Sequence, residues 1–381
     1  KNNVVYHCYY REKICQCYFK STRVYTKVSI FMNDLKIRIS TFVAYSAIIL
    51  INLRFFIGDV LKVGTSFLTI IVLGILLVSI DYRKVTSILF IPLVFLLLSF
   101  VNSGAIGLLF LFLFCYAAKD CKIENIALLN VIMQVLILVC VYFSLKFNLI
   151  ALNIAETDIK SGYDLGMGNA NTFSVFIFSI VCNLYILFVK KSRVILPIIL
   201  FVISLLAYYY SACRTIFISE IVLLLIHFVI CFGGKGKLAK YRRLLALMPV
   251  VLFLLLVYFS LNYETYWELN ILLSQRLACY YQVFQNLSLK SLVLGLSIPE
   301  GTPFDSSILI FYVYGGLLGA LWFWMLFWKT ITRNFWKVVN FCPVIIAALV
   351  GGISESFFAS VSIPGNVIMI MILYQNSKYV K

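Results

Sequence analysis

Two arginines have the chemistry and the placement to hold a phosphate group. Arg214 follows the aromatic stretch Tyr208-Tyr209-Tyr210, and Arg276 lies in the middle of a long polar segment. A guanidinium presents a planar fork of N–H donors that grips phosphate or carboxylate in two places and keeps its charge. The alternative for each is a side chain that snorkels to a lipid–water interface and contacts a headgroup.

Three further ionisable residues are candidates, each with a structural alternative. Glu220 lies in an apolar run about 9 Å from its end at roughly 1.5 Å per residue, and His227 follows at i+7 on the same helical face. An intramembrane carboxylate is a functional candidate by default, although Glu220 could instead be a protonated acid that bonds a neighbouring helix, and His227 a packing residue. Asp305 ends a segment rich in proline and directly precedes an apolar run, where a helix N-cap is the favoured interpretation.

The elements that position these residues are membrane helices. Of 381 residues, 63% are apolar and 12% are charged, whereas an ordinary soluble domain has about 25% charged residues. A membrane crossing takes roughly 20 apolar residues, so the apolar residues of this chain are enough for about twelve membrane helices. This composition excludes a water-soluble enzyme, a secreted disulfide scaffold and a disordered protein. We therefore predict an all-α, polytopic membrane helix bundle.

The apolar runs divide the chain into about twelve spans, with eleven to thirteen as the range. The last two runs share one stretch broken at Ser354-Glu355-Ser356 and Pro364-Gly365, and these two could instead be re-entrant. The runs are 39–57, 63–80, 85–101, 104–118, 126–146, 172–189, 194–210, 215–232, 244–261, 306–328, 338–354 and 362–376.

The charges in the connecting loops predict an orientation. With the N-terminus inside and twelve crossings, 25 of the 32 basic residues fall on the inner side, as the positive-inside rule requires. Both chain ends are then cytoplasmic, and the formal net charge of +17 needs no nucleic acid to explain it. The predicted organisation is a cytoplasmic segment 1–38, of which 1–31 could be an over-extended start, a membrane domain 39–376 and a cytoplasmic tail 377–381.

Two long loops lie on the outer side in this arrangement, at 151–171 and 262–305. The second contains Tyr266, Trp267, Tyr280 and Tyr281, and its part 270–287 has a helix-like pattern. A disordered linker would be poorer in aromatic and aliphatic residues, so we expect this loop to fold back onto the bundle. The eleven cysteines form no disulfide framework and no metal-binding pattern, and no nucleotide-binding or zinc-hydrolase motif is present.

Three segments resemble, in order and spacing, the Wzy-type polysaccharide repeat-unit polymerases, which are related to the O-antigen ligases. The first is Gly168-Asn169-Ala170-Asn171-Thr172, with Ala170 where proline is frequent in the family. The second is Ser211-Ala212-Cys213-Arg214-Thr215, with Cys213 where serine is usual. The third set is Arg276, Gly295, Asp305-Ser306 and the glycine-rich Tyr314–Gly319.

The resemblance implies metal-independent, inverting glycosyl transfer on the outer face of the bacterial cytoplasmic membrane, without a cofactor or nucleic acid. The donor would be a glycan on undecaprenyl pyrophosphate, and the acceptor the next lipid-linked repeat unit of a capsule, exopolysaccharide or O-antigen. A repeat-unit flippase and a chain-length regulator are the implied protein partners. The ligase branch often has His near the position of Asp305, so its absence here favours a polymerase.

The resemblance also implies roles for single residues. Arg214 and Arg276 would hold the pyrophosphate, and Asp305 or Glu264 would be the general base. Two other classes remain open: a lipid-linked oligosaccharide flippase or other transporter, in which Glu220 and His227 would dominate, and, less favoured, a membrane acyltransferase. The expected substrate-binding residues are Asn169, Asn171, Glu220, Trp267, Tyr280 and Tyr281.

Overall fold

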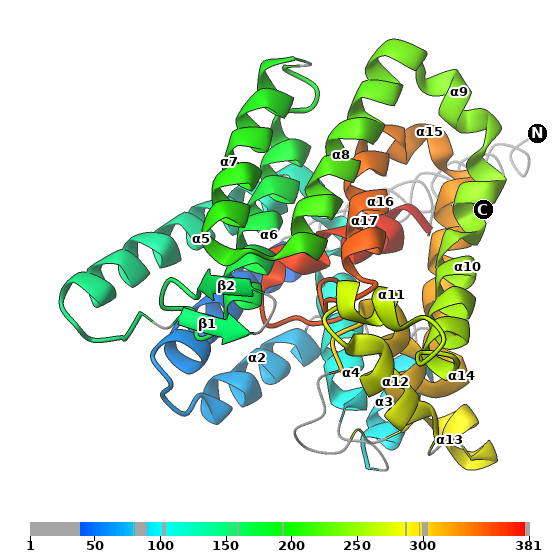
Figure 1. Ribbon diagram of the computed structural model, residues 1–381, viewed down its shortest axis with the longest axis horizontal. Helices are drawn as coiled ribbons and strands as arrows, with labels where there is room; N and C mark the ends of the chain where they lie inside the picture. Colours follow the sequence, from blue (N-terminus) through cyan, green and yellow to red (C-terminus); the bar gives the residue numbers. More distant parts are fainter. Residues whose placement is uncertain are drawn as a thin grey trace, which may run out of the picture.

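The computed structural model describes most of the chain as one helical assembly. The described residues are 39–78, 80, 90–100, 104–152, 154–157, 160–192, 194–285, 288–296, 298 and 304–377. Within them the structure is helical apart from loops and one short β-hairpin (Figure 1), which confirms the all-α prediction. The predicted segment 1–38 and all but the first residue of the tail 377–381 lie outside the described residues.

Six helices among the described residues are long and apolar enough to cross a membrane. They identify a multi-pass membrane protein, because about 20 apolar residues are needed for each crossing. The first of them, 39–60, ends in a π-helical turn at Phe55–Val60. The six are Ile39–Val60, α5 (Ile123–Lys146), α6 (Ala170–Phe188), α8 (Arg214–Gly233), α10 (Arg242–Leu261) and α14 (Ser307–Arg333).

The other six predicted runs also contain helices, but these are shorter. Their lengths of 10 to 17 residues leave the count of twelve separate crossings and the orientation as predictions. They are α2 (Ser66–Val78), α3 (Phe90–Ser99), α4 (Ala105–Ala117), α7 (Ile195–Ser211), α16 (Cys342–Gly351) and α17 (Ile368–Ser377).

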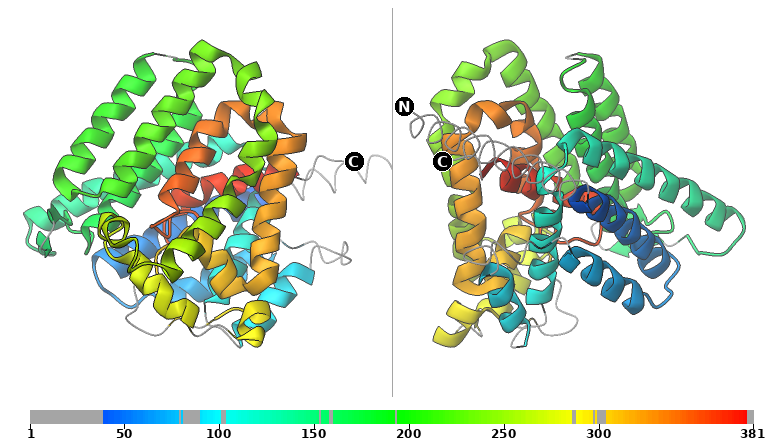
Figure 2. Two further views of the ribbon diagram at one scale, coloured as in Figure 1. Left: turned by 45° about the vertical axis from the view of Figure 1, so that its right-hand side comes forward. Right: turned by 180° about the vertical axis from the view of Figure 1, so that it is seen from behind.

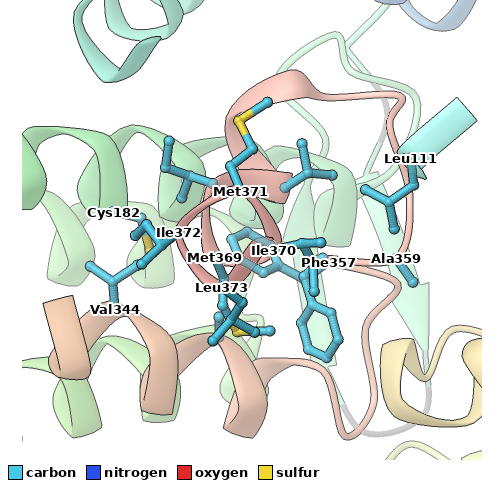
Figure 3. Close-up of a cluster of buried hydrophobic side chains, with 14 of the residues drawn as sticks. Leu111, Cys182, Val344, Phe357, Ala359, Met369, Ile370, Met371, Ile372 and Leu373 are labelled. Carbon is cyan, nitrogen blue, oxygen red and sulfur yellow. The ribbon is translucent and has the colours of Figure 1, made fainter. Parts of the chain in front are cut away.

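The short helix α17 lies at the centre of the assembly. Every side chain from Ile368 to Leu373 is at most 1% exposed, and Figure 3 shows this helix among side chains from α4, α6 and α16. A helix that is apolar on all sides is buried either in protein or in the membrane, and the side chains around α17 show that protein buries it. Residues 352–363, which join α16 to the turn η4 (Pro364–Val367), are not helical. Such backbone is tolerated at membrane depth where protein surrounds it.

Both predicted outer loops contain regular structure. In 151–171, strands β1 (Ile154–Thr157) and β2 (Lys160–Tyr163) pair antiparallel, and the sequence pattern had not predicted them. The described part of the loop 262–305 contains three short helices: α11 (Trp267–Leu272), α12 (Arg276–Gln285) and α13 (Leu289–Leu294). The helix-like pattern at 270–287 is therefore broken before Arg276. Helix α12 packs on α10 and α13 packs on α14, so the loop folds back onto the bundle as expected.

The contact of α13 with α14 depends on two glycines. Gly316 interrupts α14 with φ +57°, and Gly295 ends α13 with φ +86°. A Cβ on Gly316 would meet the backbone carbonyl of Val293, and one on Gly295 would meet the carbonyls of Val313 and Tyr314. Glycine is required at both positions because the two backbones touch and both have positive φ. This contact holds the outer loop against the start of α14.

The bundle has two different ends, as Figures 1 and 2 show. We call one the loop end: it contains β1, β2, α11, α12, α13 and the first residues of α6, α8 and α14. At the opposite end, the Gln375 amide donates to the carbonyl oxygens of Ala118 and Cys121. We call this the basic end. Its basic residues include Lys119, Lys122, Lys190, Lys191, Lys235, Lys237, Lys240, Arg242, Arg243, Lys329, Arg333 and Lys337.

Candidate functional site

Arg276 is aimed into the protein by the turn that precedes it. Ser274 and Gln275 both have positive φ, 56° and 62°, a conformation that costs free energy in residues other than glycine. The turn is held by Asn270, whose carbonyl oxygen accepts from the Gln275 N–H at 2.7 Å and whose side-chain oxygen accepts from the Ala278 N–H at 3.2 Å. Helix α12 thus begins with the Arg276 side chain only 8% exposed.

The guanidinium of Arg276 lies between two carboxylates. Its Nη2 is 2.9 Å from Glu355 Oε1 and 3.4 Å from Asp305 Oδ2. Glu355 is as buried as Arg276, whereas the Asp305 side chain is 41% exposed. The buried Nη1 of Arg276 has no hydrogen-bond partner among the described residues. An unpaired buried donor is uncommon, and here it leaves one nitrogen of the guanidinium that neither carboxylate contacts.

The electrostatics keep Arg276 charged and its neighbour Tyr280 neutral. Burial alone would lower the pKa of Arg276. The nearby Glu355, Tyr280 and Asp305 raise the pKa by more than burial lowers it, so it lies above the ordinary value. Tyr280 lies one turn along α12 and is fully buried, and burial raises the pKa of its hydroxyl. That hydroxyl donates to the carbonyl oxygen of Ile353 at 3.4 Å.

The two carboxylates are brought together by the first residues of α14. The Ser307 N–H and hydroxyl both donate to the Glu355 carbonyl oxygen, at 3.1 and 2.8 Å. The Ser306 hydroxyl donates to the Gly352 carbonyl oxygen at 3.1 Å and also accepts from the Leu309 N–H. Ser306 is therefore the N-cap of α14, and the interpretation of Asp305 as the N-cap is wrong. Asp305 is left free to face Arg276.

Arg214 enters the same region from the start of α8. Ala212, with φ +53°, ends α7 and turns the chain into α8. The hydroxyl groups of Ser354 and Thr215 are 3.0 Å apart, which ties the Glu355 segment to the first turn of α8. Arg214 and Arg276 line one small cavity of about 10 Å³, together with Glu355 and Asn171. The structure thus brings together two arginines that are 62 positions apart in the chain.

A larger polar cavity of about 320 Å³ adjoins this small one, since Asn171 and Glu355 line both. The Asn169 side chain caps α6 by accepting from the Asn171 N–H at 2.8 Å. Three acidic and one basic residue contribute charge to the larger cavity. Its polar lining includes Asp59, Lys62, Asn169, Asn171, Asp305, Glu355 and Asn366.

Other residues expected in the site lie elsewhere. Glu264 is exposed and accepts from the Tyr263 hydroxyl at 3.2 Å, and Trp267 is 49% exposed. The Tyr281 ring packs on that of Tyr263, with centroids 5.1 Å apart. None of these expected residues is among those that line the two cavities. The buried ring of Tyr280 contacts Phe304 edge-on and has no face open to a sugar.

Glu220 and His227 are buried inside the bundle. Glu220 is 2% exposed, and its Oε1 has no hydrogen-bond partner among the described residues. His227 Nδ1 is 2.9 Å from the Tyr185 hydroxyl. Glu220 does not line either cavity at the loop end, so it is separate from the arginine pair.

Sequence reasoning missed Glu355, Asp59 and Lys62 as site residues. A signal for Glu355 was present, because it interrupts an otherwise apolar stretch, and a carboxylate within such a stretch is a functional candidate. Asp59 and Lys62 gave no comparable signal, since charges at the end of a predicted span are common.

Comparison with protein-family models, curated proteins and solved structures gives no match. The geometry at the loop end is therefore the basis for assigning a function. It consists of two arginines, a buried carboxylate and a half-exposed carboxylate around connected polar cavities. Such an arrangement suits an anionic substrate with hydroxyl groups, because guanidinium groups bind phosphate and carboxylates accept protons from hydroxyls.

Proposed function

We propose that this protein is a membrane polysaccharide polymerase. It joins oligosaccharide repeat units carried on undecaprenyl pyrophosphate by metal-independent glycosyl transfer on the outer face of the bacterial cytoplasmic membrane. The observation that carries the proposal is the shared cavity of Arg214 and Arg276, with Asp305 within ion-pair distance of Arg276. Two fixed cations beside a carboxylate that can accept a proton are what transfer from a pyrophosphate donor requires.

The reaction follows from these groups. A hydroxyl oxygen of the acceptor sugar bonds to the anomeric carbon of the donor glycan, and the bond from that carbon to the pyrophosphate oxygen breaks. The pyrophosphate leaves with the bonding electron pair, and Arg214 and Arg276 compensate its added charge. The hydroxyl proton passes to Asp305, which lines the larger cavity and is more exposed than Glu355. Glu355 holds Arg276 in place.

A third cavity at the loop end favours a substrate that is linked to a lipid. It has a volume of about 380 Å³ and shares Ser356, Ser360 and Ser362 with the polar cavity. Its lining is largely apolar, with Arg54 at hydrogen-bond distance from the Thr69 hydroxyl. A polar cavity for sugars beside an apolar one matches an amphipathic substrate with a polyisoprenoid chain. The apolar residues include Ile51, Val72, Leu108, Phe110, Phe304 and Ile310.

Reconstitution tests the proposal directly. The purified full chain in liposomes is supplied with undecaprenyl-pyrophosphate-linked repeat units, and the products are separated by gel electrophoresis. A ladder of multiples is expected, with release of undecaprenyl pyrophosphate, and the ladder should be absent with the Arg276→Lys variant. Transfer of one glycan to a lipid acceptor without a ladder would indicate a ligase, and unchanged single units would contradict the proposal.

A further inference from the structure

A separate cavity of about 400 Å³ lies at the basic end, away from the proposed catalytic site. It is formed by the last turns of α6 and α8, the first residue of α9 (Lys235–Lys240) and Asn340. His227, which lines it, is 13 residues along α8 from Arg214, or about 20 Å at 1.5 Å per residue. The two sites are therefore at opposite ends of the same helix.

The inner part of this cavity is a hydrogen-bonded group of buried polar side chains. The Tyr185 hydroxyl and His227 Nδ1 are 2.9 Å apart, and His227 Nε2 is 3.4 Å from Cys231 Sγ. Tyr185 and His227 are each 1% exposed. These contacts fix the imidazole and the phenol as polar groups at the end of a cavity whose walls include Val189 and Ile230.

The outer part of the cavity carries positive charge. Lys190, in the turn after α6, and Lys235, the first residue of α9, both line it. Lys190 Nζ is 2.8 Å from Glu124 Oε1, with both side chains partly exposed, and Lys235 makes no salt bridge within the described part of the chain. The Asn340 amide adds further hydrogen-bonding capacity. The outer part thus combines excess positive charge with neutral donors.

We propose that this cavity binds a phosphate group, with Lys190 and Lys235 as its cationic contacts and Asn340 as a neutral one. Basic pockets between membrane helices bind the headgroups of anionic phospholipids. Volumes of this size accommodate a small organic ligand, so a phospholipid headgroup such as phosphatidylglycerol fills the cavity better than free inorganic phosphate. This site does not depend on the polymerase function.

The test is a binding titration of the full chain purified in detergent. Native mass spectrometry measures the affinity for phosphatidylglycerol and for the zwitterionic phosphatidylcholine, and inorganic phosphate is added as a competitor. Each of Lys190→Gln and Lys235→Gln should weaken phosphatidylglycerol binding about fivefold, the factor for one basic residue at a membrane surface. Lys191→Gln and Lys237→Gln are matched controls, since neither lysine lines the cavity, and should change binding less than twofold.

The outcomes separate the sources of the phosphate. Selective binding of phosphatidylglycerol that inorganic phosphate does not displace supports a lipid headgroup. Displacement by inorganic phosphate, with the same dependence on Lys190 and Lys235, supports the site with free phosphate as its ligand. If all four variants bound phosphatidylglycerol as tightly as the unsubstituted protein, the proposal would be overturned. Lys190 and Lys235 would then only offset the negative C-terminal ends of α6 and α8.

A second measurement does not depend on these substitutions. Cys231 lines the cavity, so an occupied site should shield its thiol from alkylation by N-ethylmaleimide. Peptide mass spectrometry should show slower modification of Cys231 with phosphatidylglycerol than with phosphatidylcholine, while Cys279, which is partly exposed on α12 at the loop end, serves as the reference thiol. Equal rates at Cys231 in both lipids, and no slowing by inorganic phosphate, would also overturn the proposal.

Discussion

The two ends of the helix bundle use positive charge in different ways. At the loop end, Arg276 is buried and contacts two carboxylates from distant parts of the chain, Asp305 and Glu355. At the basic end, Lys190 pairs with Glu124, but the two side chains are 60% and 38% exposed. The Arg276 guanidinium and the Glu355 carboxylate are shielded from water, whereas the Lys190–Glu124 pair is open to solvent and screened by salt.

This difference separates the buried arginine of the proposed catalytic site from the partly exposed lysine pair of the basic end. Removing one partner of a buried ion pair leaves an uncompensated charge and is strongly destabilising, while an exposed pair contributes about 0–1 kcal/mol. Many basic residues at one end are sufficient to bias insertion, because the positive-inside rule depends on their number and not on their geometry. Substitutions at the two ends should therefore differ greatly in effect.

The largest effect is expected for Arg276. Arg276→Lys keeps the charge but loses the planar guanidinium whose Nη2 contacts both Asp305 and Glu355. Polymer yield should fall at least ~100-fold, as for the loss of one fixed donor to a developing charge. The measurement is polymer ladder intensity in a deletion strain that expresses the variant. Lys290→Gln is the matched control, because Lys290 is an exposed basic residue at the same end. Normal chain lengths with Arg276→Lys would contradict the role of the arginine.

Arg214 and Glu220 distinguish a polymerase from a flippase or other transporter. Arg214→Gln should lower polymer yield about 100-fold because it removes the second cation of the shared cavity. Glu220→Gln should change it less than about threefold, since Glu220 does not line the cavities at the loop end. Both yields are measured at equal membrane abundance. The reverse order, with Glu220→Gln inactive and Arg214→Gln active, would favour a transporter.

Substitutions of Asp305 and of Glu355 should differ in whether they mainly lower activity or mainly lower stability. Asp305→Asn is expected to lower polymer formation by roughly 100-fold or more, as for the loss of a general base, with a stability loss of at most about 1 kcal/mol because its side chain is 41% exposed. Glu355→Gln should cost about 1–3 kcal/mol, because it weakens a buried charged hydrogen bond. Activity assays and unfolding in detergent measure the two effects. Equal losses of stability would show that exposure does not distinguish the two carboxylates.

Much of the helical architecture could be predicted from the sequence, because a membrane helix leaves a continuous apolar run. Each of the twelve runs contains a helix. The pattern could not distinguish α17, surrounded by protein, from a helix that faces lipid, because both are apolar on all sides. The hairpin β1–β2 was also missed, since four-residue strands leave little periodic signal.

The site was predictable only in part. Arg214 and Arg276 stood out because basic residues are uncommon on the predicted outer side. In the structure both arginines line one cavity. Glu355 joins them through hydrogen bonds from Ser307 to its backbone, a contact between distant segments that spacing along the chain does not encode. Glu264 was chosen for its charge and its place in the outer loop, but it is exposed and does not line either cavity.

The smallest effect is expected at the basic end, for Lys119. Its Nζ lies 3.7 Å from the centroid of the Tyr116 ring, and a partly exposed cation–π contact contributes about 0.5–1 kcal/mol. Lys119→Gln should lower the free energy of unfolding by no more than that and leave polymer length and yield unchanged within twofold. Arg276→Lys, measured in the same membranes, supplies the contrast. If Lys119→Gln reduced polymer as strongly as Arg276→Lys, the basic end would contribute to the reaction, and the restriction of the proposed catalytic site to the loop end would be wrong.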